Sequence, residues 1–83
     1  MTLKDREKKV KEEFLKELGD HIRLARKEKN ISGAELSRLL FMEKSNISRL
    51  EKGRVNPSVY LIKQICDVLE ISLDDFWKKF TKK

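Results

Sequence analysis

The sequence contains few of the residues that cross-link or bend a small protein. Its 83 residues include one cysteine, one proline and three glycines. A single cysteine, Cys66, excludes an intramolecular disulfide and a metal site built from several thiolates. No apolar run approaches the roughly 20 residues of a membrane-spanning helix, and residues 1–17 are too densely charged for a secretory signal peptide. We therefore expect one cytoplasmic domain without a metal or other cofactor.

Catalytic constellations are equally scarce. The only histidine, His21, has no cysteine or second histidine at ligand spacing, so we expect it on the exposed surface of a helix. Cys66 lies on an apolar helical face, where we expect a small core residue. The chain has no set of nucleophile and base and no phosphate-binding loop, so we do not expect an enzyme.

Charge, in contrast, is abundant: 41% of the residues are charged, and the net charge is +6. A basic surplus favours polyanionic partners, because each neutralised phosphate releases counterions. The surplus is uneven, with +2 over residues 43–56, −3 over residues 57–75 and +4 over residues 76–83. This distribution predicts one side that faces DNA, a neutral or acidic back and a basic tail at residues 78–83.

Apolar residues recur at helical spacing and nowhere alternate as in a strand, so the sequence predicts an all-α domain of five helices. The first helix spans about residues 3–29. Acid–base pairs four residues apart support it, and Leu3, Val10 and Phe14 form a narrow apolar stripe along it. Gly19 is the position at which we expect this helix to break or bend.

Serine residues at N-cap positions mark the starts of three further helices, because their side-chain oxygens accept hydrogen bonds from amides of the first turn. They are Ser32, Ser58 and Ser72. A helix over about residues 44–52 is expected to end at Gly53, which adopts positive φ without steric cost. Asn30 tolerates the same conformation and is expected to end the first helix.

Residues 33–40 and 44–52 are two short helices joined by a short turn, the pattern of a helix-turn-helix. The second helix suits DNA, because a helix is about 10–12 Å wide and the major groove is about 12 Å wide. Ile47 and Leu50 are expected to face inward. The polar residues left outward or at the flanks are Lys44, Ser45, Asn46, Ser48, Arg49 and Lys52. Basic residues that we interpret as surface charges are Arg23, Lys27 and Lys29.

The segments on both sides of this motif have a specific spacing. They are Leu18-Gly19-x-x-Ile22-Arg23-x-Ala25-Arg26, Ile31-Ser32-x-x-Glu35-Leu36-Ser37, Ile47-Ser48-Arg49-Leu50-Glu51-Lys52-Gly53-Arg54-x-Asn56-Pro57-Ser58, and Leu69-x-Ile71-Ser72-Leu73-Asp74-Asp75-Phe76. In this combination the sequence resembles the Cro/repressor-type (XRE) helix-turn-helix family over about residues 18–77. The resemblance implies a compact five-helix, lambda-repressor-like DNA-binding domain, with residues 1–17 as a charged helical extension and residues 78–83 as the tail.

The resemblance also implies roles for individual residues. Those at or beside positions that touch bases are Lys44, Ser45, Asn46 and Arg49. Those expected to contact phosphates are Ser32, Gly33, Ser48, Lys52 and Arg54. Arg26 and Glu51 match a pair that, in the family, bridges the first helix and the end of the recognition helix.

Three positions depart from the family pattern. Gly33 replaces a glutamine that commonly meets the DNA backbone, so this contact is missing or is made by the Gly33 amide. Phe41 replaces the usual glycine of the turn, where positive φ costs an aromatic residue about 1–2 kcal/mol. Either the turn differs or the strain is tolerated. Glu43 replaces a serine or threonine cap and is a poorer one.

One recognition helix contacts only a few base pairs, so we expect a homodimer on an inverted-repeat operator. The expected interface residues are Leu61, Val68, Trp77 and Phe80, and the rival interface is the stripe of the first helix. The sequence thus predicts a nucleoid-associated transcriptional repressor that binds double-stranded DNA and needs no small-molecule ligand. The alternative is a protein-interaction module of the same fold, such as an antitoxin or anti-regulator. The sequence does not distinguish a phage repressor from a restriction–modification controller or an antitoxin.

Overall fold

A computed structural model describes residues 2–81, and all five elements within them are α-helices. They are α1 (Leu3–Glu28), α2 (Gly33–Leu39), α3 (Lys44–Glu51), α4 (Val59–Val68) and α5 (Leu73–Thr81). No residue in the range 2–81 is assigned to a strand. The predicted all-α, five-helix architecture is therefore confirmed. The part of the predicted tail at residues 82–83 lies outside the described residues.

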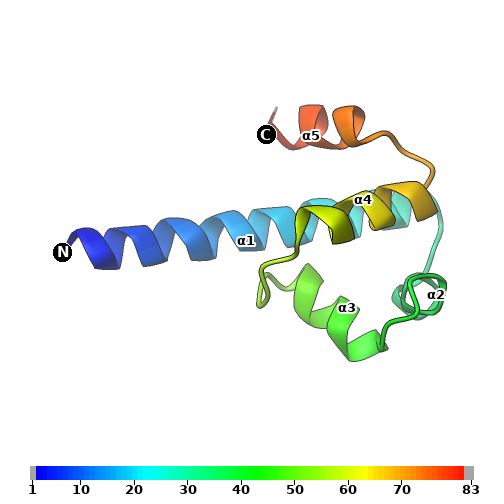
Figure 1. Cartoon of the computed structure of the whole chain (residues 1–83), viewed down its shortest axis with the longest axis horizontal. Helices are drawn as coiled ribbons and strands as arrows, with labels where there is room; N and C mark the ends of the chain where they lie inside the picture. Colours follow the sequence, from blue (N-terminus) through cyan, green and yellow to red (C-terminus); the bar gives the residue numbers. More distant parts are fainter. Residues whose placement is uncertain (1, 82–83) are drawn as a thin grey trace.

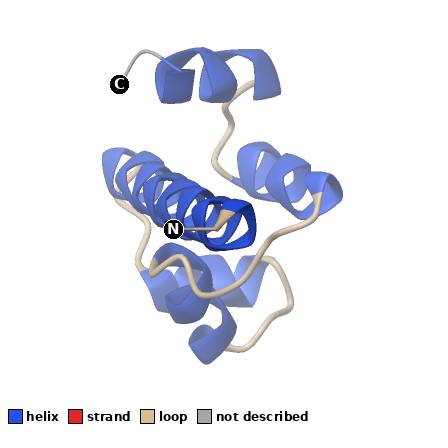
Figure 2. Cartoon of the chain, turned by 90° about the vertical axis from the view of Figure 1, so that its left-hand side faces the viewer, coloured by secondary structure: helices blue, strands red, loops and turns tan. Residues whose placement is uncertain are grey.

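The long helix α1 is the axis of the molecule (Figure 1). Figure 2 looks along this helix and shows α2 and α3 on one side of it, α5 on the opposite side and α4 beside it. The N-terminal part of α1 extends beyond the other helices, and residues 3–14 are exposed to solvent. None of the helices in residues 2–81 is both long and apolar enough to cross a membrane.

A single apolar core joins the five helices. Its buried residues are Leu18, Ile22, Leu36, Ile47, Leu50, Ile62, Ile65, Cys66, Leu69 and Phe76. Each large aliphatic or aromatic side chain among them contributes about 1.5–3 kcal/mol through removal from water. The expected core position of Cys66 is confirmed, and burial raises the pKa of its thiol, with the charge of Asp67 adding to the shift.

Serine caps begin three of the helices as the sequence predicts. In each case the hydroxyl oxygen accepts a hydrogen bond of 3.0 Å from an amide three residues later. The capped pairs are Ser32 with Glu35, Ser58 with Leu61, and Ser72 with Asp75. Helix α3 differs, because Glu43 occupies the N-cap position and its side chain makes no capping hydrogen bond.

A residue with left-handed backbone follows each of the helices α1 to α4, and after α4 it is Glu70, with a φ of 57°. Asn30 has a φ of 57° and Gly53 a φ of 76°, as expected for residues that tolerate this conformation. Phe41 follows α2 with a φ of 56°. Phe41 is 97% exposed, so packing of its ring does not compensate for this backbone conformation. The turn therefore keeps the left-handed conformation and tolerates the strain, which for an aromatic residue is about 1–2 kcal/mol.

The prediction that His21 lies on the surface is wrong. Its side chain is only 7% exposed, and its Nε2 lies 2.8 Å from the carbonyl oxygen of Phe76. The imidazole also packs on the rings of Phe76 and Phe80, with centroid distances of 4.5 and 5.4 Å. Helix α5 covers this side of α1, so His21 is buried between the two helices.

The expected break at Gly19 is also wrong, because α1 continues through it without interruption. A Cβ atom at Gly19 would lie 2.6 Å from the carbonyl oxygens of both Leu50 and Glu51. The glycine is therefore required for the close approach of the end of α3 to α1, and not for a bend.

Replacement of Gly19 by alanine tests this explanation. We expect Gly19→Ala to lower the free energy of unfolding by about 1–3 kcal/mol, because backbone atoms of α3 must move away. Alanine is otherwise the better helix former by about 1 kcal/mol. Urea denaturation measures the change. The control is Gly33→Ala, whose Cβ would have its nearest neighbour at 4.0 Å. A Gly19→Ala variant as stable as the parent would contradict the close-approach explanation.

Candidate nucleic-acid interface

Helix α3 has one buried and one exposed side. Ile47 and Leu50 are 1% and 2% exposed and anchor the helix in the core, as predicted. Lys44, Ser45 and Arg49 are exposed on the remaining surface. The helix therefore presents basic and hydroxyl groups to solvent from a position fixed by apolar packing.

A bidentate ion pair fixes α3 against α1. The Nε of Arg26 donates to Oε2 of Glu51 at 2.8 Å, and Nη2 donates to Oε1 at 2.9 Å. Nη1 of the same guanidinium donates to the carbonyl oxygen of Ile31 at 2.8 Å. The hydrogen bonds that Arg26 donates to Glu51 raise the pKa of Arg26, although burial alone would lower it. One guanidinium thus joins α1, the loop before α2 and the end of α3.

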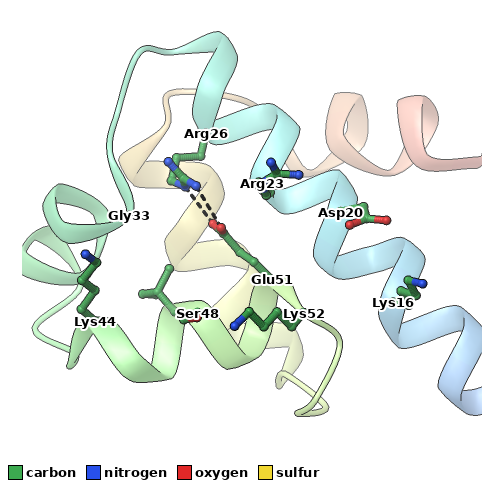
Figure 3. A pocket seen from close by; sticks show the side chains of 10 residues that line it. Lys16, Asp20, Arg23, Arg26, Gly33, Lys44, Ser48, Glu51 and Lys52 are labelled. Carbon is green, nitrogen blue, oxygen red and sulfur yellow. Dashed lines mark hydrogen bonds and ion pairs between the residues drawn. The ribbon is translucent and has the colours of Figure 1, made fainter.

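A groove of about 560 Å³ lies between α1 and α3. Figure 3 shows Lys16, Asp20 and Arg23 on the α1 wall. Residues on the α3 side are Lys44, Ser48 and Lys52, and the ion pair lies between the two helices. Gly33 is at the end of the groove near α2. Because Arg26 and Glu51 neutralise one another, the remaining charged groups are four cations and one carboxylate.

The structure divides the residues expected to contact bases. Lys44 lines the groove, together with the expected phosphate contacts Ser48 and Lys52. Ser45, Asn46 and Arg49 do not line it. Arg49 instead donates a hydrogen bond to the side-chain oxygen of Asn46. The outer surface of α3 therefore has two adjoining faces, one toward the groove and one away from it.

The other expected phosphate contacts lie at the ends of α2 and α3. Ser32 is exposed and uses its hydroxyl oxygen to cap α2. Gly33 lines the groove. Arg54 is exposed after α3, where its amide donates to the carbonyl oxygen of Arg49.

Arg26 is the one residue of α1 that was predicted from the sequence to belong to this site. The structure adds Lys16 and Arg23, which line the groove from α1. The available signal was their spacing of seven residues, which puts two basic groups on the same side of a helix. Their position opposite α3 required the tertiary fold.

The residues expected at a dimer interface are half-buried. Leu61, Val68, Trp77 and Phe80 all pack partly against the core. In the rival stripe on α1, Leu3 is 70% and Val10 is 65% exposed. The two surfaces meet, because the rings of Phe14 and Phe80 make an edge-to-face contact at 5.5 Å. Among residues 2–81, no group of three or more His, Cys, Asp or Glu side chains is arranged to hold a metal.

Comparison with known proteins identifies the family. A helix-turn-helix family model matches residues 22–76. The chain therefore belongs to the helix-turn-helix family of the Cro/repressor (XRE) type, as the sequence motifs predicted. Helices α2 and α3 are the two helices of this DNA-binding motif, and α3 is its recognition helix.

Two solved structures of the clp gene regulator ClgR from Corynebacterium glutamicum are similar to this chain. In one, the match has a TM-score of 0.75 and 27% identity and covers 81% of this chain and 86% of ClgR. In the other, the TM-score is 0.76 with 27% identity, and the match covers 81% and 71% of the two chains. Among curated proteins, none matches this chain.

Replacement of Glu51 by glutamine tests the role of the ion pair. We expect Glu51→Gln to lower the free energy of unfolding by about 3 kcal/mol, because it leaves a largely buried guanidinium without its counter-charge. Urea denaturation followed by circular dichroism measures this loss. The matched control is Asp67→Asn, which removes an ion pair of 2.7 Å to Lys63 on the exposed side of α4. The control is expected to unfold at the same urea concentration as the parent. Equal effects of the two variants would contradict a special role for Arg26 and Glu51.

Proposed function

We propose that this protein is a sequence-specific transcriptional repressor that binds an inverted-repeat operator as a homodimer, with α3 in the major groove. The observation that supports the proposal most is the orientation of α3. Its apolar side is anchored by Ile47 and Leu50, and its end is held by Glu51. Its polar side is therefore presented as a rigid surface. Rigid presentation favours specific binding because little conformational freedom is lost on DNA.

The two faces of α3 suit different parts of DNA. Arg49 is our principal candidate for base contact, because a guanidinium pairs with two acceptors of guanine. Asn46 accepts a hydrogen bond from Arg49 and restricts its direction. Ser45 lies beside them, and Lys44 is at the boundary of the groove. We assign phosphate contacts to the remaining set, Ser32, Gly33, Ser48, Lys52 and Arg54. Gly33, Ser48 and Lys52 line the groove, Ser32 caps α2, and Arg54 follows α3.

The comparisons support a function in the regulation of transcription. ClgR is a gene regulator, and the match covers most of both chains. We propose the same class of function here, with no catalytic reaction and with the nucleoid as the place of action. Residues 18–77 would form the DNA-binding domain, with residues 1–17 as an extension and residues 78–83 as a basic tail.

Homodimerisation through Leu61, Val68, Trp77 and Phe80 completes this proposal. These apolar side chains retain exposed surface although they pack on the core. A second copy covering them would bring two recognition helices to one operator, which raises affinity and specificity together.

A second candidate function is that of a protein-interaction module. The observation in its favour is Phe41, which is 97% exposed beside the recognition helix. An exposed phenyl ring adds no buried area to the fold, and a strained backbone often marks a functional position. An antitoxin or anti-regulator would use such a residue to hold another protein.

Selection of bound duplexes from a random DNA library tests the proposed function. We expect an inverted repeat to be enriched by the parent protein. Arg49→Ala is expected to lose discrimination at defined bases, at about 10–100-fold for a bidentate contact, whereas Lys52→Ala weakens all duplexes alike. The control is Lys63→Ala on the exposed side of α4, which is expected to bind like the parent.

The outcomes separate the two candidate functions. Enrichment of an inverted repeat supports an operator-binding dimer, and a single half-site would contradict the dimer. Binding without sequence preference, or none at moderate salt, would contradict the operator proposal and favour the protein-interaction module.

A further inference from the structure

The groove between α1 and α3 contains basic residues that the proposed recognition helix does not supply. Lys16 and Arg23 come from α1 and line the same groove as Lys44 and Ser48 of α3 and Lys52 at its end (Figure 3). We propose that this groove binds the DNA phosphate backbone, and that Lys16 and Arg23 neutralise phosphates alongside the helix-turn-helix. This inference rests on the proposed DNA-binding function and extends the contact surface onto α1.

The charge balance of the groove favours an anion. Its lining has cations at Lys16, Arg23, Lys44 and Lys52 and a single unpaired carboxylate at Asp20. The other two charged groups, Arg26 and Glu51, are joined in the bidentate pair and cancel. Bringing four like charges to facing walls costs electrostatic free energy, which a bound phosphate lowers.

Neither α1 cation is used to stabilise the fold. Among the described residues, ion pairs involve Arg26, Arg38, Lys63 and Lys78, so Lys16 and Arg23 are in none. Both are exposed. Their charges are therefore available to a ligand at little cost, because no existing contact must be broken.

The size and length of the groove suit a backbone segment. Its volume is about 560 Å³, and Gly33 contributes no side chain to fill the end near α2. A Cβ at Gly33 would have only Arg26 Cζ nearby, at 4.0 Å. Lys16 and Arg23 are seven residues apart, which is about 10 Å along a helix. Phosphates of one strand rise about 3.4 Å each, so the two cations reach different phosphates.

A small organic anion is less well matched than DNA. The groove of the protein opens beside the exposed face of α3. A helix-turn-helix places this helix in the major groove of DNA. A duplex bound to α3 would therefore bring a strand of phosphates toward the same opening. Four cations that lie apart from one another are complementary to a polyanion with repeated charges, and less so to one compact anionic ligand.

The test measures how DNA affinity depends on salt. Lys16→Gln, Arg23→Gln and the double variant are compared with the parent, using the duplex enriched by the parent. Affinity is followed by fluorescence anisotropy from 50 to 300 mM salt. Each lost phosphate contact is expected to reduce the log–log slope by about 0.9 and to weaken binding by about 5–8-fold near 0.1–0.15 M salt.

The matched control is Lys11→Gln. Lys11 lies on the same helix and faces the stripe of Leu3, Val10 and Phe14 instead of the groove. Lys11 and Lys16 each follow a glutamate by four residues, so each substitution removes one positive charge from the same local sequence setting. The control is expected to keep the parent's slope, and urea denaturation checks that all variants remain folded.

In the double variant, the log–log slope of affinity against salt concentration is expected to be smaller by about 1.8. A parent-like slope in the double variant, together with a reduced slope in Lys52→Gln, would overturn the α1 contact but leave the proposed function standing. Equal losses in Lys11→Gln and Lys16→Gln would also overturn it, because the effect would then be general charge. Failure of the parent to bind any duplex would remove the proposed function itself.

Discussion

The ion pair between Arg26 and Glu51 is the interaction on which the position of the recognition helix depends. The guanidinium makes two hydrogen bonds to the carboxylate and a third to the carbonyl oxygen of Ile31. Short, charge-assisted contacts of this kind impose direction as well as attraction. Gly19 complements the pair, because the end of α3 approaches the α1 backbone too closely for a side chain there. Together they fix the distance and the rotation of α3 relative to α1.

The consequence is a division of α3 into two polar faces. Lys44, Ser48 and Lys52 line the groove between α3 and α1, together with basic residues of α1. Ser45 and Arg49 remain on the outside, exposed to solvent. DNA presents two different kinds of group at the same place, base edges within the groove and phosphates at its rim. The geometry of α3 relative to α1 therefore suits specific and charge-based contacts at once.

Much of the fold could be predicted because its signals are local. A serine cap needs only a hydroxyl and an amide three residues later, so Ser32, Ser58 and Ser72 were identified from sequence. The inward positions of Ile47 and Leu50 follow from helical spacing in the same way. The family motif added the relation between α2 and α3, which no short-range pattern contains.

The remaining features depend on residues far apart in the sequence. His21 was expected on the surface, but its environment is set by Phe76, 55 residues later. Gly19 looked like a weak point because only its helix propensity was visible, whereas the contact that requires it comes from Leu50 and Glu51. The groove itself was not predictable, since it exists only where α1 passes α3. The turn at Phe41 was left open by the sequence, and the structure keeps its left-handed backbone.

We propose that α3 and the groove beside it form the DNA-binding surface. The most direct measurement is a titration of ¹⁵N-labelled protein with the enriched duplex, followed by amide chemical shifts. We expect the largest changes on residues 44–54 and on the groove residues of α1, with small changes on the exposed side of α4. Changes concentrated on α4 and α5, or spread evenly over the chain, would contradict it.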